Sequence, residues 1–333
     1  MQTKKIVNDP RRVVPELIDG VIAAYGGRIR KLGEKNALVK SELPQGKVGL
    51  LVGGGSGHEP LFAAFIGKNL ADGAACGNVF AAPSPDTILE ATRALSKGNG
   101  VLYVYGNYAG DNMNFDIAAE LAAGEGIPVR TVRVWDDVAS APADRFTDRR
   151  GIAGDVFVIK VAGAAAASLG SLDEVLRVTT KARDATRSMG VAVSAGSIPE
   201  TGAPTFDLPA DEIEIGMGLH GEPGVSREKM LEADPLVDKM MSRLLADLPF
   251  RRGDEVCLLV NDLGATTAME LWIVTRRVHQ VLAGAGIRVH DTLIGSFCTC
   301  QEMAGFSISL LRLDAELGRH WDAPADSLAL RKA

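Results

Sequence analysis

Two histidines of this chain stand in glycine-rich segments with a Glu-Pro pair close behind. His220 lies in EIGMGLHGEPG (214–224), and His58 lies in GGGSGHEP (53–60). A neutral imidazole is a nucleophile, and a carbonyl carbon is its natural electrophile. Neighbouring glycines let the backbone turn and let a small ligand approach. For either histidine alone a tight turn is the simpler interpretation, but the two together favour a ligand site.

A third candidate is an aspartate in the segment NYAGDNMN (107–114). Asp111 follows a predicted strand, and ligands of open α/β sheets bind beyond the carboxyl ends of strands. Its carboxylate could act as a base or accept a hydrogen bond from a hydroxyl group. A second interpretation, equally compatible with these residues, is that Asp111 or Asn112 caps the next helix.

The elements that would position these residues alternate in the first half of the chain. Strand-loop-helix units in series indicate an α/β layer with a largely parallel sheet. Strands are predicted over 46–52, 100–105, 128–134 and 156–160, and helices over 60–70, 114–123 and 171–187.

The second half has a different pattern, which favours an antiparallel or mixed sheet. Strands are predicted over 191–194, 212–217, 254–260, 287–293 and 307–313, with a helix over 266–283. The fold class is therefore α/β, with two α/β domains whose mixed sheets are flanked by helices. The predicted domains are 1–187, with the GGGSGHEP and NYAGD loops, and 188–333, with His220.

Composition and charge exclude several classes of protein. The net charge of −6 over 333 residues argues against nucleic acid or an anionic membrane as a partner. No secretory leader pattern opens the chain, so a cytoplasmic location is expected. The four cysteines lack metal-ligand spacing and are expected to be reduced and structural. The segment 53–60 is neither a Walker loop nor a good dinucleotide fingerprint.

Two further polar segments have open interpretations. Asp136 and Asp137 end a strand and could bind a metal, although such acidic pairs are more often solvated or capping. The segment NDLGATT (261–267) follows an apolar strand and either caps the next helix or faces a partner.

Five segments, taken together and in order, resemble the ketose-binding subunit of dihydroxyacetone kinases, the DhaK or Dak1 family. They are GGGSGHEP (53–60), GNYAGDNMNFD (106–116), RRGIAGDVFVIKVAGAAA (149–166), EIGMGLHGEPG (214–224) and LVNDLGATTAMEL (259–271). The tail DAPADSL (322–328) is similar as well. The resemblance extends over nearly the whole chain.

The resemblance implies a chemistry for the candidate residues. His220 would attack the ketone of a small substrate and hold it as a covalent hemiaminal. His58 and Asp111 would contact the substrate hydroxyls and assist deprotonation of the hydroxyl that attacks phosphate. The backbone of Gly55, Ser56 and Gly57 would line the pocket. No metal is expected on this chain.

The resemblance also implies partners and a homodimer of two-domain chains. Because no phosphate loop or magnesium motif is present, the nucleotide (ATP or ADP with Mg²⁺) is expected on a separate DhaL-like subunit. A phosphotransferase-system protein could supply the phosphoryl group.

One position departs from the family pattern. Relatives commonly have lysine just before the asparagine of NYxGD, where it contacts substrate, but Gly106 stands here. A larger pocket without this cation is compatible with a four-carbon ketose such as erythrulose. A non-catalytic ketose sensor that co-activates transcription is the alternative from another class.

Overall fold

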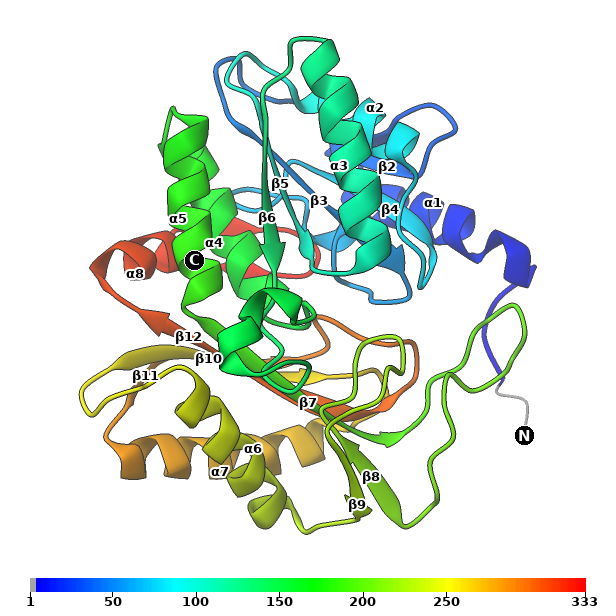
Figure 1. Cartoon of the computed structure of the whole chain (residues 1–333). Helices are drawn as coiled ribbons and strands as arrows, with labels where there is room; N and C mark the ends of the chain where they lie inside the picture. Colours follow the sequence, from blue (N-terminus) through cyan, green and yellow to red (C-terminus); the bar gives the residue numbers. More distant parts are fainter. Residues whose placement is uncertain (1–3) are drawn as a thin grey trace. The chain divides into compact units, whose positions relative to one another are not determined.

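The computed structural model describes residues 4–333, which fold into two units, each with its own six-stranded sheet. The first unit comprises Lys5–Val134, Val156–Arg183 and Leu317–Ala333, and the second unit comprises Trp135–Asp155 and Asp184–Glu316. Figure 1 follows the chain through both units. The predicted class, two α/β domains with mixed sheets flanked by helices, is confirmed.

The sheet of the first unit has the strand order β1-β2-β4-β3-β5-β6. The strands from β4 to β6 in this order are parallel, while β1 and β2 add an antiparallel edge. Every residue of β3 and β5 is buried, as expected for central strands covered on both faces. The strands are β1 (Ile29–Lys31), β2 (Ala37–Lys40), β3 (Gly49–Ser56), β4 (Gly73–Val79), β5 (Val101–Gly106) and β6 (Val129–Val134).

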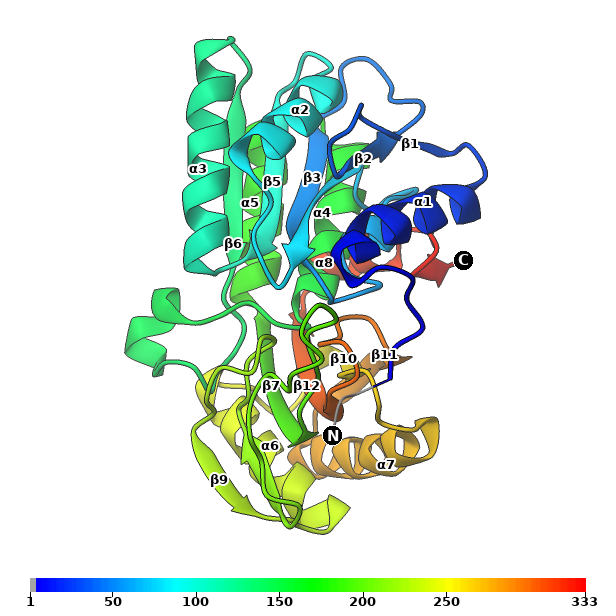
Figure 2. The same cartoon turned by 90° about the vertical axis from the view of Figure 1, so that its right-hand side faces the viewer.

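Helices cover both faces of this sheet, with α3 on one side and α4 on the other (Figure 2). Local signals fix their ends: the Ser84 hydroxyl accepts from the Thr87 N–H to cap α2, and Gly26 ends α1 in the left-handed conformation. The helices are α1 (Val13–Tyr25), α2 (Pro85–Leu95), α3 (Ala109–Gly124), α4 (Asp155–Ser168), α5 (Leu172–Asp184) and α8 (Ala315–Asp322), with 3₁₀ turns at Pro10–Arg12 and Ala63–Phe65 and the short hairpin β13 (Ala325–Asp326) and β14 (Arg331–Lys332).

The sheet of the second unit has the order β11-β10-β12-β7-β8-β9, and only the β10–β11 pair is parallel. Thr267 begins α7 with a full capping box to Glu270. The elements are β7 (Thr186–Ser194), β8 (Glu212–Ile215), β9 (Ser226–Lys229), β10 (Glu255–Asp262), β11 (Arg288–Gly295), β12 (Ala304–Leu313), α6 (Ala233–Asp247), α7 (Ala268–Ala285) and a 3₁₀ segment at Ala143–Asp148.

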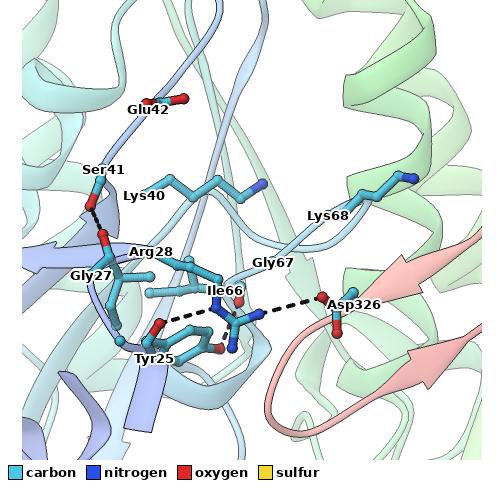
Figure 3. Close-up of a pocket in the computed structure, with 12 residues that line it drawn as sticks. Tyr25, Gly27, Arg28, Lys40, Ser41, Glu42, Ile66, Gly67, Lys68 and Asp326 are labelled. Atoms are coloured by element: carbon cyan, nitrogen blue, oxygen red, sulfur yellow. Dashed lines mark hydrogen bonds and ion pairs between the residues drawn. The ribbon is translucent and has the colours of Figure 1, made fainter. Parts of the chain in front are cut away.

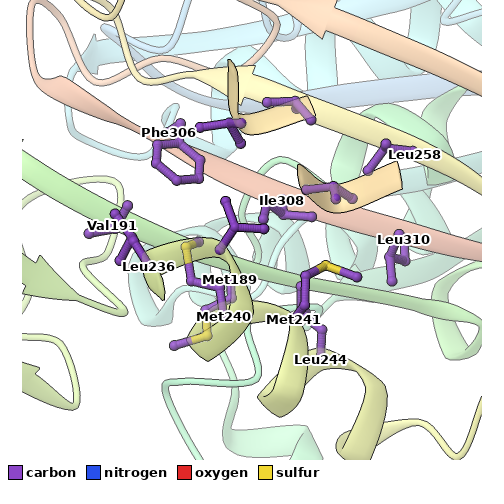
Figure 4. Close-up of a cluster of buried hydrophobic side chains, with 14 of the residues drawn as sticks. Met189, Val191, Leu236, Met240, Met241, Leu244, Leu258, Phe306, Ile308 and Leu310 are labelled. Carbon is purple, nitrogen blue, oxygen red and sulfur yellow. The ribbon is translucent and has the colours of Figure 1, made fainter. Parts of the chain in front are cut away.

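The core of the second unit lies between its sheet and the helices α6 and α7. Met240, Met241 and Leu244 of α6 pack against strand residues such as Met189 and Ile308 (Figure 4). Unbranched methionine side chains fill the irregular space between helix and sheet. This packing holds β7 and β8 in place, and the His220 loop begins where β8 ends.

Two predicted elements of the first half are wrong. Residues 60–70 form no α-helix but only the 3₁₀ turn at Ala63–Phe65, and positive φ angles at Phe62 and Asn69 exclude a continuous helix. The predicted strand 156–160 is instead the start of α4. Residues 156–160 are buried on all sides, and this removes the periodicity that separates helix from strand.

The predicted helix 171–187 ends earlier, at Asp184, because β7 begins at Thr186. The sequence-based prediction places one domain boundary at 187/188, whereas contacts divide the chain after Lys5 at 134/135, 155/156, 183/184 and 316/317. Residues 135–155 join the second unit, and the tail after Glu316 returns to the first. No change in amino-acid composition marks the positions where the chain passes from one unit to the other. Residues 1–3 of the predicted first domain lie outside the described residues.

Candidate functional site

The first part of the candidate site lies where β3 ends. Gly57 follows the strand with φ +103°, a conformation that favours glycine, and its N–H donates to the Glu59 carboxylate at 3.0 Å and 3.2 Å. His58 is 3% exposed, and its ring lies 5.3 Å from the Phe80 ring. The Ser56 hydroxyl donates to the Gly77 carbonyl at 2.8 Å. The turn thus holds His58 in a fixed, largely dehydrated position.

The preceding glycines belong to the strand, whereas the sequence had suggested a loop over 53–60. A Cβ atom on Gly53 would lie 2.5 Å from the Ala75 carbonyl oxygen, one on Gly54 would lie 2.5 Å from the Phe62 ring, and one on Gly55 would lie 2.8 Å from the Ala81 nitrogen. Close packing of the strand therefore explains these three glycines, and only Gly57 serves the turn itself.

The second part lies where β5 ends and α3 begins. Tyr108 is the N-cap residue of α3, so neither Asp111 nor Asn112 occupies the N-cap position. Asp111 lies in the first turn and is 9% exposed. The Asn112 amide donates to the Asn107 side-chain oxygen at 2.8 Å, which ties the loop to the helix. The positive end of the helix dipole favours a negative charge at Asp111.

The topology of the first sheet brings these two parts to the same place. β3 and β5 are parallel neighbours, so the segments that carry His58 and Asp111 leave the same edge of the sheet. The chain continues from β3 to β4 on one side and from β5 to β6 on the other. Such a topological switch point forms the ligand-binding crevice of open α/β sheets. Gly106, the last residue of β5, lies at this edge as well.

His220, a separate candidate residue, belongs to the second unit, in the loop 216–225 between β8 and β9. Gly216 and Gly221 have φ angles of +81° and +85°, so the turns of this loop favour glycine at both positions. Met217 and Leu219 are buried and anchor the loop, while the His220 side chain is 25% exposed. This arrangement leaves the imidazole accessible on a fixed backbone.

Glu222 holds the His220 ring in one orientation. One carboxylate oxygen lies 2.9 Å from His220 Nδ1, and the other accepts from the His220 backbone N–H at 2.9 Å. Burial alone would raise the pKa of Glu222, but the hydrogen bonds and charge of His220 outweigh it and lower this pKa to about 2. An ionised carboxylate can only accept, so Nδ1 carries a proton, and in the neutral form of the ring the lone pair is then on Nε2.

The space between Glu222 and Arg150 is available only because residue 218 is glycine. A Cβ atom on Gly218 would lie 2.2 Å from a Glu222 carboxylate oxygen and 2.5 Å from Arg150 Nη1. Arg150 donates to the Gly216 carbonyl at 2.9 Å and to the buried Asp137 carboxylate at 2.8 Å and 3.0 Å. Arg150 therefore ties the beginning of the His220 loop to the second unit. Sequence reasoning did not single out Arg150, Glu222 or Gly218 for these roles.

The other polar segments are structural. Asp136 and Asp137 are fully buried, not solvated, and Asp136 accepts from the backbone N–H groups of Ile152 and Gly154, each at 2.8 Å. In the segment 261–267, Asp262 accepts from the backbone of Gly264 and Thr266, and the following Thr267 caps α7.

The remaining sequence expectations concern cysteines, metals and membranes. All four cysteines are buried and free of disulfides. Within residues 4–333, no three His, Cys, Asp or Glu side chains are grouped so that they could hold a metal ion. No helix in this described part has the length and apolar character needed to cross a membrane.

Comparisons with known proteins agree with these motifs. The Dak1 domain matches residues 19–329. A Listeria innocua protein, named dihydroxyacetone-binding subunit DhaK of PTS-dependent dihydroxyacetone kinase 2, is 43% identical over 97% of this chain and 98% of its own length. The L-erythrulose kinase of Pectobacterium atrosepticum is 41% identical, and the alignment covers 98% of this chain but 56% of the kinase.

Solved structures give the same result. The dihydroxyacetone kinase of C. freundii superposes with a TM-score of 0.90 at 34% identity, covering 99% of this chain and 60% of that chain. The dihydroxyacetone kinase operon co-activator DhaQ superposes with a TM-score of 0.89 at 30% identity, covering 95% of this chain and 98% of its own. The chain, matched along nearly its whole length, therefore belongs to the Dak1 family.

Proposed function

We propose that this chain is the ketose-binding subunit of a dihydroxyacetone kinase-type phosphotransferase, in which His220 captures a short ketose as a hemiaminal. The observation that carries the proposal is the contact between Glu222 and Nδ1 of His220, which leaves Nε2 as a nucleophile on an accessible ring. Family membership supports the kinase class, and the name of the L. innocua relative supports the binding role.

The bond-forming step follows from this contact. Nε2 attacks the carbonyl carbon, the C=O π electrons move to the oxygen, and that oxygen takes up a proton. The ring gains positive charge as the bond forms, and the ionised Glu222 carboxylate stabilises this charge until Nδ1 releases its proton to water. The neutral hemiaminal has therefore taken up no proton overall. Loss of the bond to Nε2 reverses the step, so the capture is reversible.

A covalent bond suits this substrate class. A three- or four-carbon ketose has too few atoms to bind tightly through contacts alone, because each atom contributes a limited amount of free energy. The bond also selects for a carbonyl group, since glycerol has none and cannot form the adduct. Capture orients the terminal hydroxyl for phosphoryl transfer, where catalysis depends mostly on positioning.

The residues at the β3 and β5 ends are proposed to act on the same ketose. His58 and Asp111 would contact its hydroxyl groups, and Asp111 would accept the proton of the hydroxyl that attacks phosphate. The backbone of Gly55, Ser56 and Gly57 would contact the substrate. Support comes from the shared sheet edge of these segments and from the burial of His58 and Asp111.

Gly106 bears on the choice of ketose. The absence of a lysine side chain at this position would leave room for a fourth carbon, and the erythrulose kinase of P. atrosepticum is among the relatives. Dihydroxyacetone and erythrulose are therefore the two substrates to compare.

The phosphoryl group is proposed to come from a separate DhaL-like subunit that holds ATP or ADP with Mg²⁺. The phosphotransferase-system donor in the name of the L. innocua relative favours ADP that is rephosphorylated on the partner. A homodimer of this chain is part of the same proposal.

A co-activator role is the second candidate, favoured by the similarity to DhaQ over nearly the full length of both chains. Both candidates use the same ketose capture, so the partner distinguishes them. Co-purification from the source cell with a nucleotide-binding subunit, and phosphorylation of ketose by the pair, would support the kinase. A transcription factor as the ketose-dependent partner would replace the kinase with the co-activator.

The capture itself is tested by intact-mass measurement under native conditions with dihydroxyacetone and erythrulose, because a hemiaminal adds the whole ketose to the chain. The wild type is expected to gain the mass of one ketose, and His220→Ala is expected to gain none. Because only the neutral ring is a nucleophile, the adduct should weaken as the pH is lowered from neutral to acid. Equal adduct in His220→Ala, or a flat response from neutral to acid pH, would contradict the proposal.

A further inference from the structure

A second cavity lies wholly within the first unit, at the β1–β2 edge of the sheet. Its volume is about 560 Å³, within the range of small-ligand sites. Tyr25, Ile29 and Ile66 are buried and give it an apolar floor, and Arg28, Lys40 and Lys68 contribute cationic side chains. Figure 3 shows Arg28 and Lys40 extending in the same direction, toward the side where Lys68 and Asp326 lie.

The carboxylates around this cavity are too few for its cations. Asp72 is shared between Lys40, at 2.7 Å, and Lys47. Asp326 is shared in the same way between Arg28, at 3.4 Å, and Arg331, at 3.3 Å.

Lys68 has no carboxylate within 4.0 Å among residues 4–333, and its side chain is exposed. Glu42, the remaining acid of the lining, lies in Figure 3 away from Lys68 and Asp326. The cavity and its neighbours thus hold five cations against three carboxylates, on a chain whose net charge is −6.

The position of the Arg28 side chain suits the binding of an anion. Its Nε donates to the Tyr25 carbonyl at 3.0 Å and its guanidinium lies 5.1 Å from the centre of the Tyr25 ring. The side chain is still about half exposed, and its bond to Asp326 is long. A planar guanidinium binds phosphate through paired hydrogen bonds, and lysines add point charges.

We propose that this cavity binds the phosphate group of a small phosphomonoester, with Arg28, Lys40 and Lys68 as its ligands. The site is distinct from the β3 and β5 ends, since none of the residues proposed there lines it. The apolar floor would contact the carbon skeleton of the ligand. Three cations that line one cavity favour a dianion over a singly charged carboxylate.

Calorimetric titration of the full chain at constant ionic strength tests the proposal, with inorganic phosphate, glycerol 3-phosphate and uncharged glycerol as probes. Both anions should bind and glycerol should not. Lys68→Gln and Arg28→Gln should each weaken binding about tenfold. Arg30→Gln, an exposed strand neighbour outside the cavity with the same charge change, should stay within about twofold.

Three results would overturn the proposed phosphate site. These are the absence of heat with either anion at millimolar concentration, an equal loss in Arg30→Gln, and displacement of the anion by saturating dihydroxyacetone, which would assign binding to the ketose site. Lys68→Gln carries the test if Arg28→Gln is unstable, because Lys68 has no ion pair to lose among the described residues.

Discussion

At the scale of single residues, the proposed capture depends on how one carboxylate meets one imidazole. The two oxygens of Glu222 contact both the backbone N–H and Nδ1 of His220, so the ring is fixed relative to the loop. The same contact sets the proton position that makes Nε2 nucleophilic. Gly218 makes this contact possible, since any side chain there would occupy the space of the carboxylate.

Gly218→Ala is therefore expected to weaken the ketose adduct at least tenfold, because its Cβ would push Glu222 away from His220. The φ angle of Gly218 is not in the left-handed region, so the effect would come from the collision and not from backbone strain. Adduct affinity by intact-mass titration is the measurement. Gly284→Ala, in α7 of the same unit with open space around its Cβ, is the control and should bind like the wild type. Normal affinity in Gly218→Ala would remove Glu222 from the mechanism.

The Asp111→Asn variant distinguishes covalent capture of the ketose from phosphoryl transfer to it. The variant should keep the adduct but lose turnover by about 10²–10⁴-fold, since an amide cannot take the hydroxyl proton. Adduct mass and the rate of ketose phosphorylation with the partner subunit are measured on the same preparation. Asp116→Asn, an exposed residue further along α3 that pairs with Arg133, is the matched control. A fully active Asp111→Asn would show that the base lies elsewhere.

At the scale of elements, strand ends and their loops carry the candidate chemistry. The parallel pair β3–β5 places the His58 and Asp111 segments at one sheet edge, and the β8–β9 hairpin carries His220. Helices α6 and α7 support that hairpin's sheet through the core of the second unit. The His220 loop is further tied down by Arg150, which links Gly216 to Asp137.

Arg150→Gln is expected to weaken the adduct roughly tenfold and to lower the stability of the second unit. The substitution removes the guanidinium group that pairs with the buried Asp137, and it releases the start of the His220 loop. Arg187→Gln, which removes one of the two arginines paired with Asp247, is the control for lost stability alone. Adduct affinity is measured well below the unfolding temperature of each variant. If Arg187→Gln weakened the adduct as much as Arg150→Gln, the effect would be general destabilisation.

At the scale of the whole molecule, buried ion pairs join segments that are distant in sequence. Asp72, which has no exposed surface, receives Lys40 from the end of β2 and Lys47 from just before β3. Burial pushes its pKa up, but the two lysines outweigh burial and hold the pKa below its usual 3.8. Its contribution to stability is thus complete above that value and is lost as pH falls through the lower folded-state pKa.

Asp72→Asn should lower the free energy of unfolding by about 3–5 kcal/mol at neutral pH, because two mostly buried lysines lose their shared anion. The gap between variant and wild type should shrink in acid, below about pH 4. Denaturant unfolding across pH is the measurement. Asp86→Asn removes an exposed pair with Lys35 and should cost no more than about 1 kcal/mol. A constant gap down to acid pH would contradict the charge assignment.

The sequence by itself determined the class of fold, the family and the three candidate residues. Apolar runs for β5, β10 and β12 were readable because these central strands are buried on both faces. Strand β4, with the sequence GAACGNV, was not predicted, since small residues have low strand propensity and are required here by close neighbours. The helix α4 was taken for a strand because burial on all sides hides its period.

Only the tertiary structure decided which partners these residues have. The pairing of Glu222 with His220 is local, yet its geometry depends on glycine turns and on Arg150, 66 residues before Gly216. Burial of Asp136 and Asp137 ruled out a solvated pair, and the cavity beside Arg28 is completed by Asp326, 298 residues away. The residue type alone fixes the chemistry that a side chain can perform. Its burial and its distance to a partner depend on segments that meet only in the folded chain.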